Sequence, residues 1–199
     1  MIELPHIRIV GLTGMSGAGK STVCGLFAES GFEVADCDKI ARRTAENPAF
    51  LRELSERFPE KLTDAEGRLD REMTAKTVFS DKDKNRLYCH IIFPYIVNAV
   101  IKEIKLRKKD IAVDAPTLFE AGLDIICTEV VSVIAPVEIC VNRIISRDGI
   151  TPEMAQKRLL SQHNADFFRE RSDFIIENSG GLEQLVNSAK SVIKTLKGG

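Results

Sequence analysis

A glycine-rich loop near the N-terminus constrains the fold more than any other feature of this 199-residue chain. Residues 11–22 read GLTGMSGAGKST and contain four glycines, one lysine and no carboxylate. The β-branched, apolar run at residues 7–13 predicts a buried strand, and a helix is expected from Lys20. Glycines allow backbone N–H groups to curl around an anion, and the helix adds its positive end. The order of strand, glycine loop and helix therefore predicts a phosphate site in an α/β fold.

The spacing Gly14-x-x-x-x-Gly19-Lys20-Ser21 fits the Walker A pattern, and we call residues 14–21 the phosphate loop. Lys20 is expected to reach the β and γ oxygens of a nucleotide, Ser21 to hold Mg²⁺, and Thr22 to support the α-phosphate. The alternative is a glycine-rich turn with a surface lysine, but the flanking strand and helix favour nucleotide binding. The predicted nucleotide contacts are Gly14, Gly17, Ala18, Gly19, Lys20, Ser21 and Thr22.

Four further short apolar runs, at residues 32–36, 110–116, 129–136 and 173–178, complete a set of five expected strands. Helical patterns separate these runs. Alternating strands and helices predict a five-stranded, parallel, doubly wound sheet flanked by helices. Ligands are then expected at the carboxyl ends of the strands.

Two helical stretches interrupt the strand pattern. Residues 39–109 read as helix throughout and predict an inserted helical region, with stops expected at Pro48, Pro59, Gly67 and Pro94. Residues 142–171 are rich in arginine and predict a mobile lid, inside which Thr151 and Pro152 mark a helix start. We therefore expect one domain, with a core of about 1–59, 106–141 and 172–199, an insertion of about 60–105 and a lid of about 142–171.

The composition limits the partners. Twenty-eight basic residues nearly balance 29 acidic ones, so no general attraction to nucleic acid or to an anionic membrane is expected. No continuous apolar run approaches the roughly 20 residues of a membrane span, and the start of the chain has no leader-like pattern. The five scattered cysteines and three histidines show no zinc spacing. We expect a cytoplasmic location, and the sequence predicts no particular oligomeric state.

Two aspartates follow the second expected strand. Asp36 and Asp38 fall at its carboxyl end, close to the phosphate loop if the sheet is parallel. One carboxylate is predicted to accept the proton of an acceptor hydroxyl, and the other to orient the acceptor or a metal-bound water. The alternative is that both aspartates only cap the next helix.

Three more charged residues are candidates for the phosphate chemistry. Asp114 ends the third expected strand, as in a Walker B segment, where an aspartate meets Mg²⁺; a turn-forming role is the alternative. Arg143 and Arg147 are four residues apart and share a helix face. This spacing predicts that both arginines donate hydrogen bonds to the transferring phosphates. The alternative for this pair is a solvated helix face.

These residues leave several classes of protein open. Another nucleotide or nucleoside kinase would share the phosphate loop and differ in its acceptor pocket. A guanine-nucleotide switch would need an Asn-Lys-x-Asp segment, which the sequence lacks. An ATPase that depends on nucleic acid would need a basic groove, which the near-zero net charge does not predict.

The motifs together resemble the dephospho-coenzyme A kinase family over nearly the whole chain. They comprise the phosphate loop, DCDKIAR, LDR, APTLFEAGL, NRIISRDGIT and SDFIIENSG. The resemblance implies a P-loop kinase fold, ATP and Mg²⁺ as cofactors, and dephospho-coenzyme A as the small-molecule substrate. It also implies transfer of the γ-phosphate to the 3′-hydroxyl of the ribose, the last step of coenzyme A synthesis.

The resemblance assigns further residues. Asp38 becomes the catalytic carboxylate together with Lys20 and Arg147, and the span after about Glu60 becomes the coenzyme-binding region. Arg143 and Arg147 become lid residues. The implied acceptor contacts are Asp36, Asp38, Arg42, Pro116, Leu118, Phe119 and Glu120. The chain departs from the family at Phe93, where the family commonly has histidine before Pro94, and at Thr117, where it has leucine.

Overall fold

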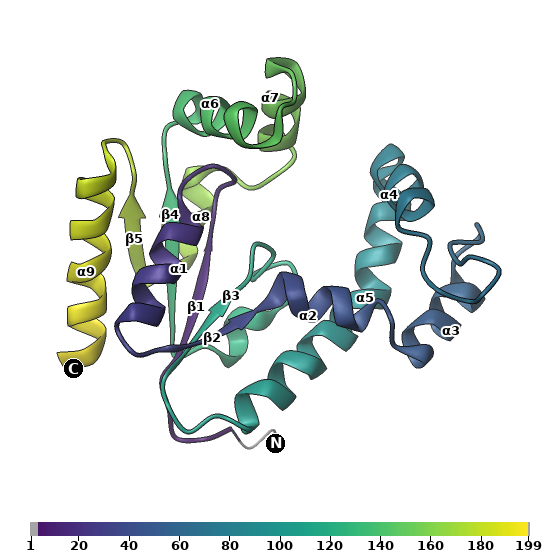
Figure 1. Cartoon of the computed structure of the whole chain (residues 1–199), viewed down its shortest axis with the longest axis horizontal. Coiled ribbons are helices and arrows are strands. Elements are labelled where there is room, and N and C mark those ends of the chain that lie inside the picture. The colour runs from purple at the N-terminus through teal and green to yellow at the C-terminus, as the bar shows by residue number, and fades with distance from the viewer. Residues whose placement is uncertain (1–3, 199) are drawn as a thin grey trace. The chain divides into compact units, whose positions relative to one another are not determined.

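The computed structural model describes residues 4–198, without the side chain of Phe79. It divides into two compact units. We call residues 4–35 with 107–198 the sheet unit, and residues 36–106 the helical unit. Figure 1 shows the elements of both units. The helical unit is one continuous insertion in the chain of the sheet unit; the finer division into core, insertion and lid stays a prediction.

Five strands form the sheet: β1 (Ile9–Gly14), β2 (Glu33–Asp36), β3 (Ile111–Asp114), β4 (Glu129–Ile134) and β5 (Phe174–Glu177). Their order is β2-β3-β1-β4-β5, and β1 pairs in parallel with both β3 and β4, as β4 does with β5. This confirms the predicted five-stranded sheet. Because β1 lies at its centre, the phosphate loop leaves from the middle of the carboxyl edge (Figure 1).

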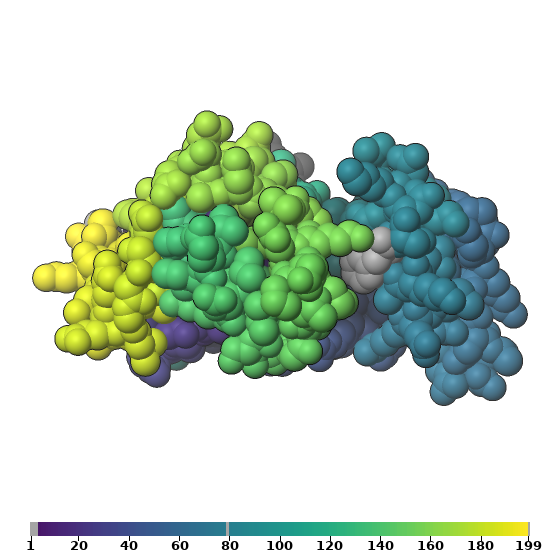
Figure 2. Space-filling model, turned by 90° about the horizontal axis from the view of Figure 1, so that it is seen from above, coloured from purple at the N-terminus to yellow at the C-terminus, as the bar shows by residue number. Residues whose placement is uncertain are grey.

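The other elements of the sheet unit are α1 (Lys20–Glu29), η1 (Leu123–Ile126), α6 (Val137–Asp148), α7 (Pro152–Leu160), α8 (Ala165–Arg171) and α9 (Leu182–Gly198). Buried residues of β1, β4, α1 and α9 form one apolar core, with Phe27 of α1 and Val131 of β4 fully enclosed. In Figure 2, α6 and α7 (green) lie at the surface of this unit. Thr151 caps α7 and Pro152 follows it, as predicted.

The helical unit contains α2 (Cys37–Thr44), α3 (Pro48–Arg57), α4 (Arg71–Ser80) and α5 (Lys82–Lys105). The other three helices pack against α5. Each helix begins after a residue whose carboxylate or amide oxygen accepts an N–H bond of the first turn, and these caps are Asp36, Asn47, Asp70 and Asp81. Such caps satisfy N–H groups that have no partner inside the helix.

One of the four expected helix stops is wrong, whereas the helix is interrupted before Pro48 as predicted. Pro48 begins α3, at a position where its missing N–H costs nothing. Pro94 lies inside α5 and does not end it. An interior proline costs about 3 kcal/mol through the lost hydrogen bond and the steric clash. Ile91 and Ile92 before it, and Ile96 after it, are buried in the core of the helical unit, and this burial offsets the cost.

Helix α5 also bears on the membrane question. Among residues 4–198 it is the one helix long and apolar enough to cross a membrane, judged by length and composition alone. Polar residues such as His90 and Asn98 interrupt it, which is why the sequence shows no continuous apolar run. A third of the qualifying segment is buried within the protein, including Val100 and Ile104, and core helices commonly meet the same criterion.

Candidate active site

The phosphate loop joins the end of β1 to the start of α1. Gly14 has a φ of +139°, and a Cβ atom there would lie 2.0 Å from the carbonyl oxygen of Val133 in β4. Only glycine allows the loop to leave the sheet this close to the neighbouring strand. Lys20 is the first residue of α1, so the loop ends at the positive end of a helix. The backbone therefore has the form that the sequence pattern predicts.

The structure brings two predicted site residues into direct contact. Lys20 Nζ forms an ion pair with Asp114 Oδ1 at the end of β3, and their side chains are only 17% and 19% exposed. The contact follows from the sheet, because Leu12 of β1 is paired in register with Asp114. The predicted phosphate cation and the predicted metal carboxylate thus occupy one place, whereas the side chain of Ser21 in the first turn of α1 is exposed.

The two predicted lid arginines have different partners. Arg143 on α6 donates from Nη1 to the carbonyl oxygens of Gly17 at 3.2 Å and Ala18 at 3.4 Å. Arg147 instead donates from Nε and Nη2 to Asp148 at 2.7 and 3.0 Å. Arg143 therefore faces the backbone of the phosphate loop, and contact of either arginine with phosphate stays a prediction.

The carboxylate that holds Arg147 is shared. Asp148 also forms an ion pair with Arg158 of α7. The hydrogen bonds from Arg147, followed by the contact with Arg158, lower the pKa of Asp148 to about 2. This three-residue cluster ties the end of α6 to α7 at physiological pH.

Two residues that the sequence analysis did not select contact the phosphate loop. Gln162, just after α7, makes two hydrogen bonds with Ser16, and Asn178, just after β5, bonds to the carbonyl oxygen of Ala18. Asn178 was accessible to sequence reasoning, because it ends a predicted strand at the edge where parallel sheets bind ligands. No pattern in the sequence marks Gln162.

The segment after β3 contains the acceptor contacts that the family resemblance implies. Leu118 is fully buried and packs against Gly11 of β1, so its side chain cannot reach a substrate. The ring of Phe119 packs edge-on against Phe167 of α8, with centroids 5.4 Å apart. Pro116 and Glu120 are exposed, and Glu120 Oε1 lies 3.6 Å from His163 Nε2.

The predicted acceptor residues on α2 belong to the helical unit. Asp36 caps α2 by accepting the N–H of Lys39 at 3.0 Å. Burial raises the pKa of Asp36, but hydrogen bonds from Lys39 and its positive charge outweigh this and lower the pKa below the usual value. Asp36 therefore caps α2, and its predicted role in orienting the acceptor stays a prediction. Asp38 is exposed, and within residues 4–198 its carboxylate forms no ion pair. It shares a helix face with Arg42, one turn later.

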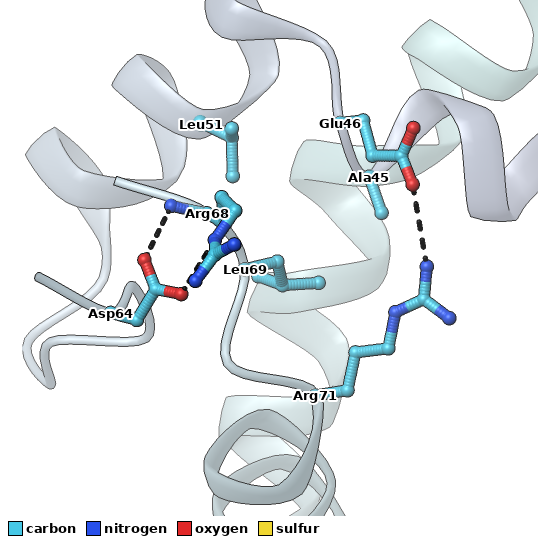
Figure 3. Close-up of a pocket in the computed structure, with 7 residues that line it drawn as sticks. All are labelled: Ala45, Glu46, Leu51, Asp64, Arg68, Leu69 and Arg71. Carbon is cyan, nitrogen blue, oxygen red and sulfur yellow. Dashed lines mark hydrogen bonds and ion pairs between the residues drawn. The ribbon is translucent and has the colours of Figure 1, made fainter. Parts of the chain in front are cut away.

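A cavity of about 380 Å³ lies within the helical unit (Figure 3). Its polar wall contains two arginines, each facing a carboxylate: Arg68 Nε is 2.9 Å from Asp64 Oδ2, and Arg71 Nη2 is 3.6 Å from Glu46 Oε1. The rest of the lining is apolar and consists of Ala45, Leu51 and Leu69. The cavity therefore combines two guanidinium groups with apolar walls.

Comparison with known proteins decides the family. The model of the dephospho-CoA kinase family matches residues 8–184. The chain belongs to this family. The dephospho-CoA kinase of Fusobacterium nucleatum is 38% identical over 192 residues, which cover 96% of this chain and 99% of that protein. A dephospho-CoA kinase of Thermus thermophilus is 34% identical, covering 99% of this chain and 96% of that protein.

Solved structures agree with this assignment. The protein TT1252 from Thermus thermophilus matches with a TM-score of 0.80 at 34% identity, over 96% of this chain and 99% of its own. A dephospho-CoA kinase from Campylobacter jejuni matches with a TM-score of 0.70 at 25% identity, over 96% and 98%. A shikimate kinase from Acinetobacter baumannii, at 20% identity and a TM-score of 0.53, shares the fold alone. The predicted family and P-loop kinase fold are confirmed. As a dephospho-CoA kinase family member, the chain is an enzyme that uses a nucleotide and a small-molecule substrate.

Proposed function

We propose that this enzyme transfers the γ-phosphate of ATP to the 3′-hydroxyl of the ribose of dephospho-coenzyme A, giving coenzyme A and ADP. One observation carries the phosphate chemistry. The phosphate loop presents its backbone at the start of α1, with Lys20 as a poorly exposed cation beside it. Family membership supports the choice of acceptor.

In the proposed reaction the donor lies on the phosphate loop. The N–H groups of the loop and the positive end of α1 bind the β-phosphate. Lys20 leaves Asp114 for the β and γ oxygens, and Thr22 supports the α-phosphate. Arg147, released from Asp148, and the remaining N–H donors of Arg143 add positive charge as the γ-phosphate moves. Lys20 and Arg147 thus each exchange an ion pair of the free protein for one with the nucleotide.

The residues present fit Mg²⁺. Among residues 4–198 no group of three or more His, Cys, Asp or Glu residues forms a metal cage. Mg²⁺ does not require one, because it usually binds through one or two oxygen ligands, water and substrate phosphates. The Ser21 hydroxyl and the Asp114 carboxylate, which Lys20 vacates, would supply those oxygens. When bound, the ion neutralises charge on the β- and γ-phosphates.

At the acceptor, a bond forms between the 3′-oxygen and the γ-phosphorus while the bond from that phosphorus to the β-γ bridging oxygen breaks. The hydroxyl proton passes to Asp38, whose carboxylate is exposed and unpaired within the described residues. Arg42, on the same face of α2, binds the acceptor beside it. Asp36 positions this pair by capping α2.

The cavity of the helical unit is a candidate for the remainder of the acceptor. Dephospho-coenzyme A carries an anionic diphosphate and a long, largely uncharged arm. The contact of Arg71 with Glu46 is long and joins two exposed side chains, so it contributes little stability and a diphosphate can displace it. Leu51 and Leu69 then offer apolar wall to the arm (Figure 3).

One assay tests the proposed function. The protein is incubated with Mg-ATP and dephospho-coenzyme A, and phosphorus NMR and mass spectrometry locate the new phosphate. We expect a 3′-phosphomonoester and one ADP for each product molecule. Nucleosides, nucleotides, DNA and RNA are tested as competing acceptors or activators. Transfer to another acceptor with none to dephospho-coenzyme A would contradict the proposal.

A further inference from the structure

Asn178 uses both ends of its side-chain amide, one toward the phosphate loop and the other toward Arg143 of α6. It lies directly after β5, is 3% exposed, and its backbone N–H donates to Ile134 in β4 at 2.8 Å. Its Nδ2 donates to the carbonyl oxygen of Ala18 at 2.7 Å, and its Oδ1 accepts from Arg143 Nη2 at 3.3 Å. The side chain is therefore fixed by the sheet on one side and by α6 on the other.

This contact sets the direction of a neighbouring N–H group. The peptide that joins Ala18 to Gly19 is planar and trans, so its carbonyl and its N–H point in opposite directions. Asn178 binds the carbonyl, and the N–H of Gly19 must then point away from Asn178. Within the described residues that N–H donates no hydrogen bond, so it is available to a ligand on the opposite side of the peptide.

The packing around Gly19 supports the same arrangement. Gly19 has a φ of +106°, and a Cβ atom there would lie 2.8 Å from Asn178 Nδ2. A side chain at position 19 would push the amide of Asn178 from the Ala18 carbonyl. Gly19 therefore leaves the space that the side-chain amide of Asn178 needs to reach the Ala18 carbonyl.

We propose that Asn178 is a positioning residue: it holds the Ala18 carbonyl so that the Gly19 N–H faces the β-phosphate of the bound nucleotide. The proposal rests on the proposed use of ATP. It differs from a contact of Asn178 with the base or the sugar, because it acts only through the phosphate loop. Arg143 helps to orient the Asn178 side chain. Because its guanidinium donates to Asn178 Oδ1, the N–H₂ end of the amide faces Ala18.

The test compares ligands that differ by one phosphate. In Asn178→Asp the side chain keeps its shape and its contact with Arg143, but loses the donor to Ala18 and places a carboxylate against a carbonyl. We expect the affinity for ADP, measured by calorimetry, to fall by about tenfold or more, which corresponds to the loss of one hydrogen bond. The affinity for AMP, which lacks the β-phosphate, should stay within about twofold of the parent value by the same argument.

A matched control is Asn164→Asp. It makes the same chemical change at an exposed residue that caps α8, where aspartate serves as well as asparagine. We expect it to bind ADP and AMP like the parent. Parental ADP binding by Asn178→Asp would overturn the proposal, as would an equal loss of ADP and AMP in a variant that melts like the parent.

A second measurement on the unmodified protein covers the case in which Asn178→Asp fails to fold. On addition of ADP, the Gly19 amide resonance should shift while the Asn178 side-chain amide protons remain protected from exchange. Loss of that protection on ADP binding would overturn the proposal. Transfer to dephospho-coenzyme A by the parent is measured separately, so its absence would count against the proposed acceptor and leave the ADP comparison intact.

Discussion

Gln162 and Ser16, 146 residues apart, form two hydrogen bonds with each other. The Nε2 group of Gln162 donates to Ser16 Oγ at 2.8 Å, and the N–H of Ser16 donates to Gln162 Oε1 at 3.1 Å. Ser16 belongs to the phosphate loop and Gln162 to the predicted lid. The pair therefore attaches the predicted lid to the phosphate loop at two points.

We expect Gln162→Glu to lower turnover while changing stability little. A glutamate keeps the acceptor for the Ser16 N–H but loses the donor to its hydroxyl. The bonds are exposed, so the loss should cost about 1 kcal/mol or less in the free energy of unfolding. Steady-state kinetics with thermal denaturation checks this, and Gln156→Glu on the exposed side of α7 is the matched control. An equal loss of turnover in the control would show that added charge on the lid, rather than the Ser16 contact, is responsible.

Lys20→Ala should fold like the parent and lose most phosphoryl transfer. The strand and helix that shape the phosphate loop remain, whereas the cation for the β and γ oxygens is gone. We expect turnover to fall by about 10²-fold or more, the usual effect of removing one charge-stabilising group. Circular dichroism and turnover decide the matter. A folded variant of nearly parental activity would refute the role of Lys20. Asp114→Asn removes the same ion pair and keeps Lys20, but it also removes a proposed Mg²⁺ ligand, so its thermal stability rather than its turnover reports on the ion pair.

Asp38→Asn should reduce transfer to the 3′-hydroxyl by about 10²- to 10⁴-fold, because the amide cannot accept the proton. A loose transition state would place the loss at the low end of this range. ATP binding should be unchanged. Asp36→Asn is the matched variant, since asparagine caps a helix as well as aspartate and α2 should remain intact. If Asp36→Asn is the inactive variant and Asp38→Asn transfers phosphate normally, Asp38 is not the proton acceptor.

The cluster around Asp148 predicts a pH dependence of stability. Its hydrogen bonds with Arg147, and then its contact with Arg158, lower the pKa of Asp148 from 3.8 to about 2 in the folded protein. A carboxylate with a lowered pKa stabilises the folded state fully above pH 3.8, and this contribution is lost as the pH falls from 3.8 towards 2. A carbon-13 NMR titration of the carboxyl group measures the pKa directly. An unshifted pKa would show that the cluster does not persist in solution.

The fold is largely predictable from the sequence because its signals are local. Each strand is a short apolar run, and Thr151 with Pro152 marks the start of α7 as expected. The helix stop predicted at Pro94 is wrong, because α5 continues through this proline. Whether a helix tolerates an interior proline depends on how the helix is buried, and local sequence patterns do not contain that information. The family followed from motifs spread along the chain, confirmed by its model.

The contacts around the phosphate loop are predictable only in part. The Walker A spacing identifies Lys20 and Ser21 without any knowledge of the sheet. In contrast, the side chains that bond to the loop backbone lie 125 or more positions away, at Arg143, Gln162 and Asn178. Their placement depends on the order of the strands and the path of α6 and α7, which hydrophobic patterns do not specify.

The helical unit enters and leaves the sheet unit between β2 and β3, two strands that are neighbours in the sheet. Within the sheet unit, the start of β2 is joined directly to the segment before β3. The N–H of Glu33 donates to the Asp110 carbonyl at 2.9 Å, and the Glu33 carboxylate forms an ion pair with Arg107 at 3.3 Å. The proposed acceptor residues of α2 and the cavity of the helical unit are therefore encoded in one uninterrupted stretch of chain, residues 36–106. Substitutions in this part of the proposed acceptor site therefore fall in one segment of the chain, and the phosphate loop at residues 14–21 lies outside that segment.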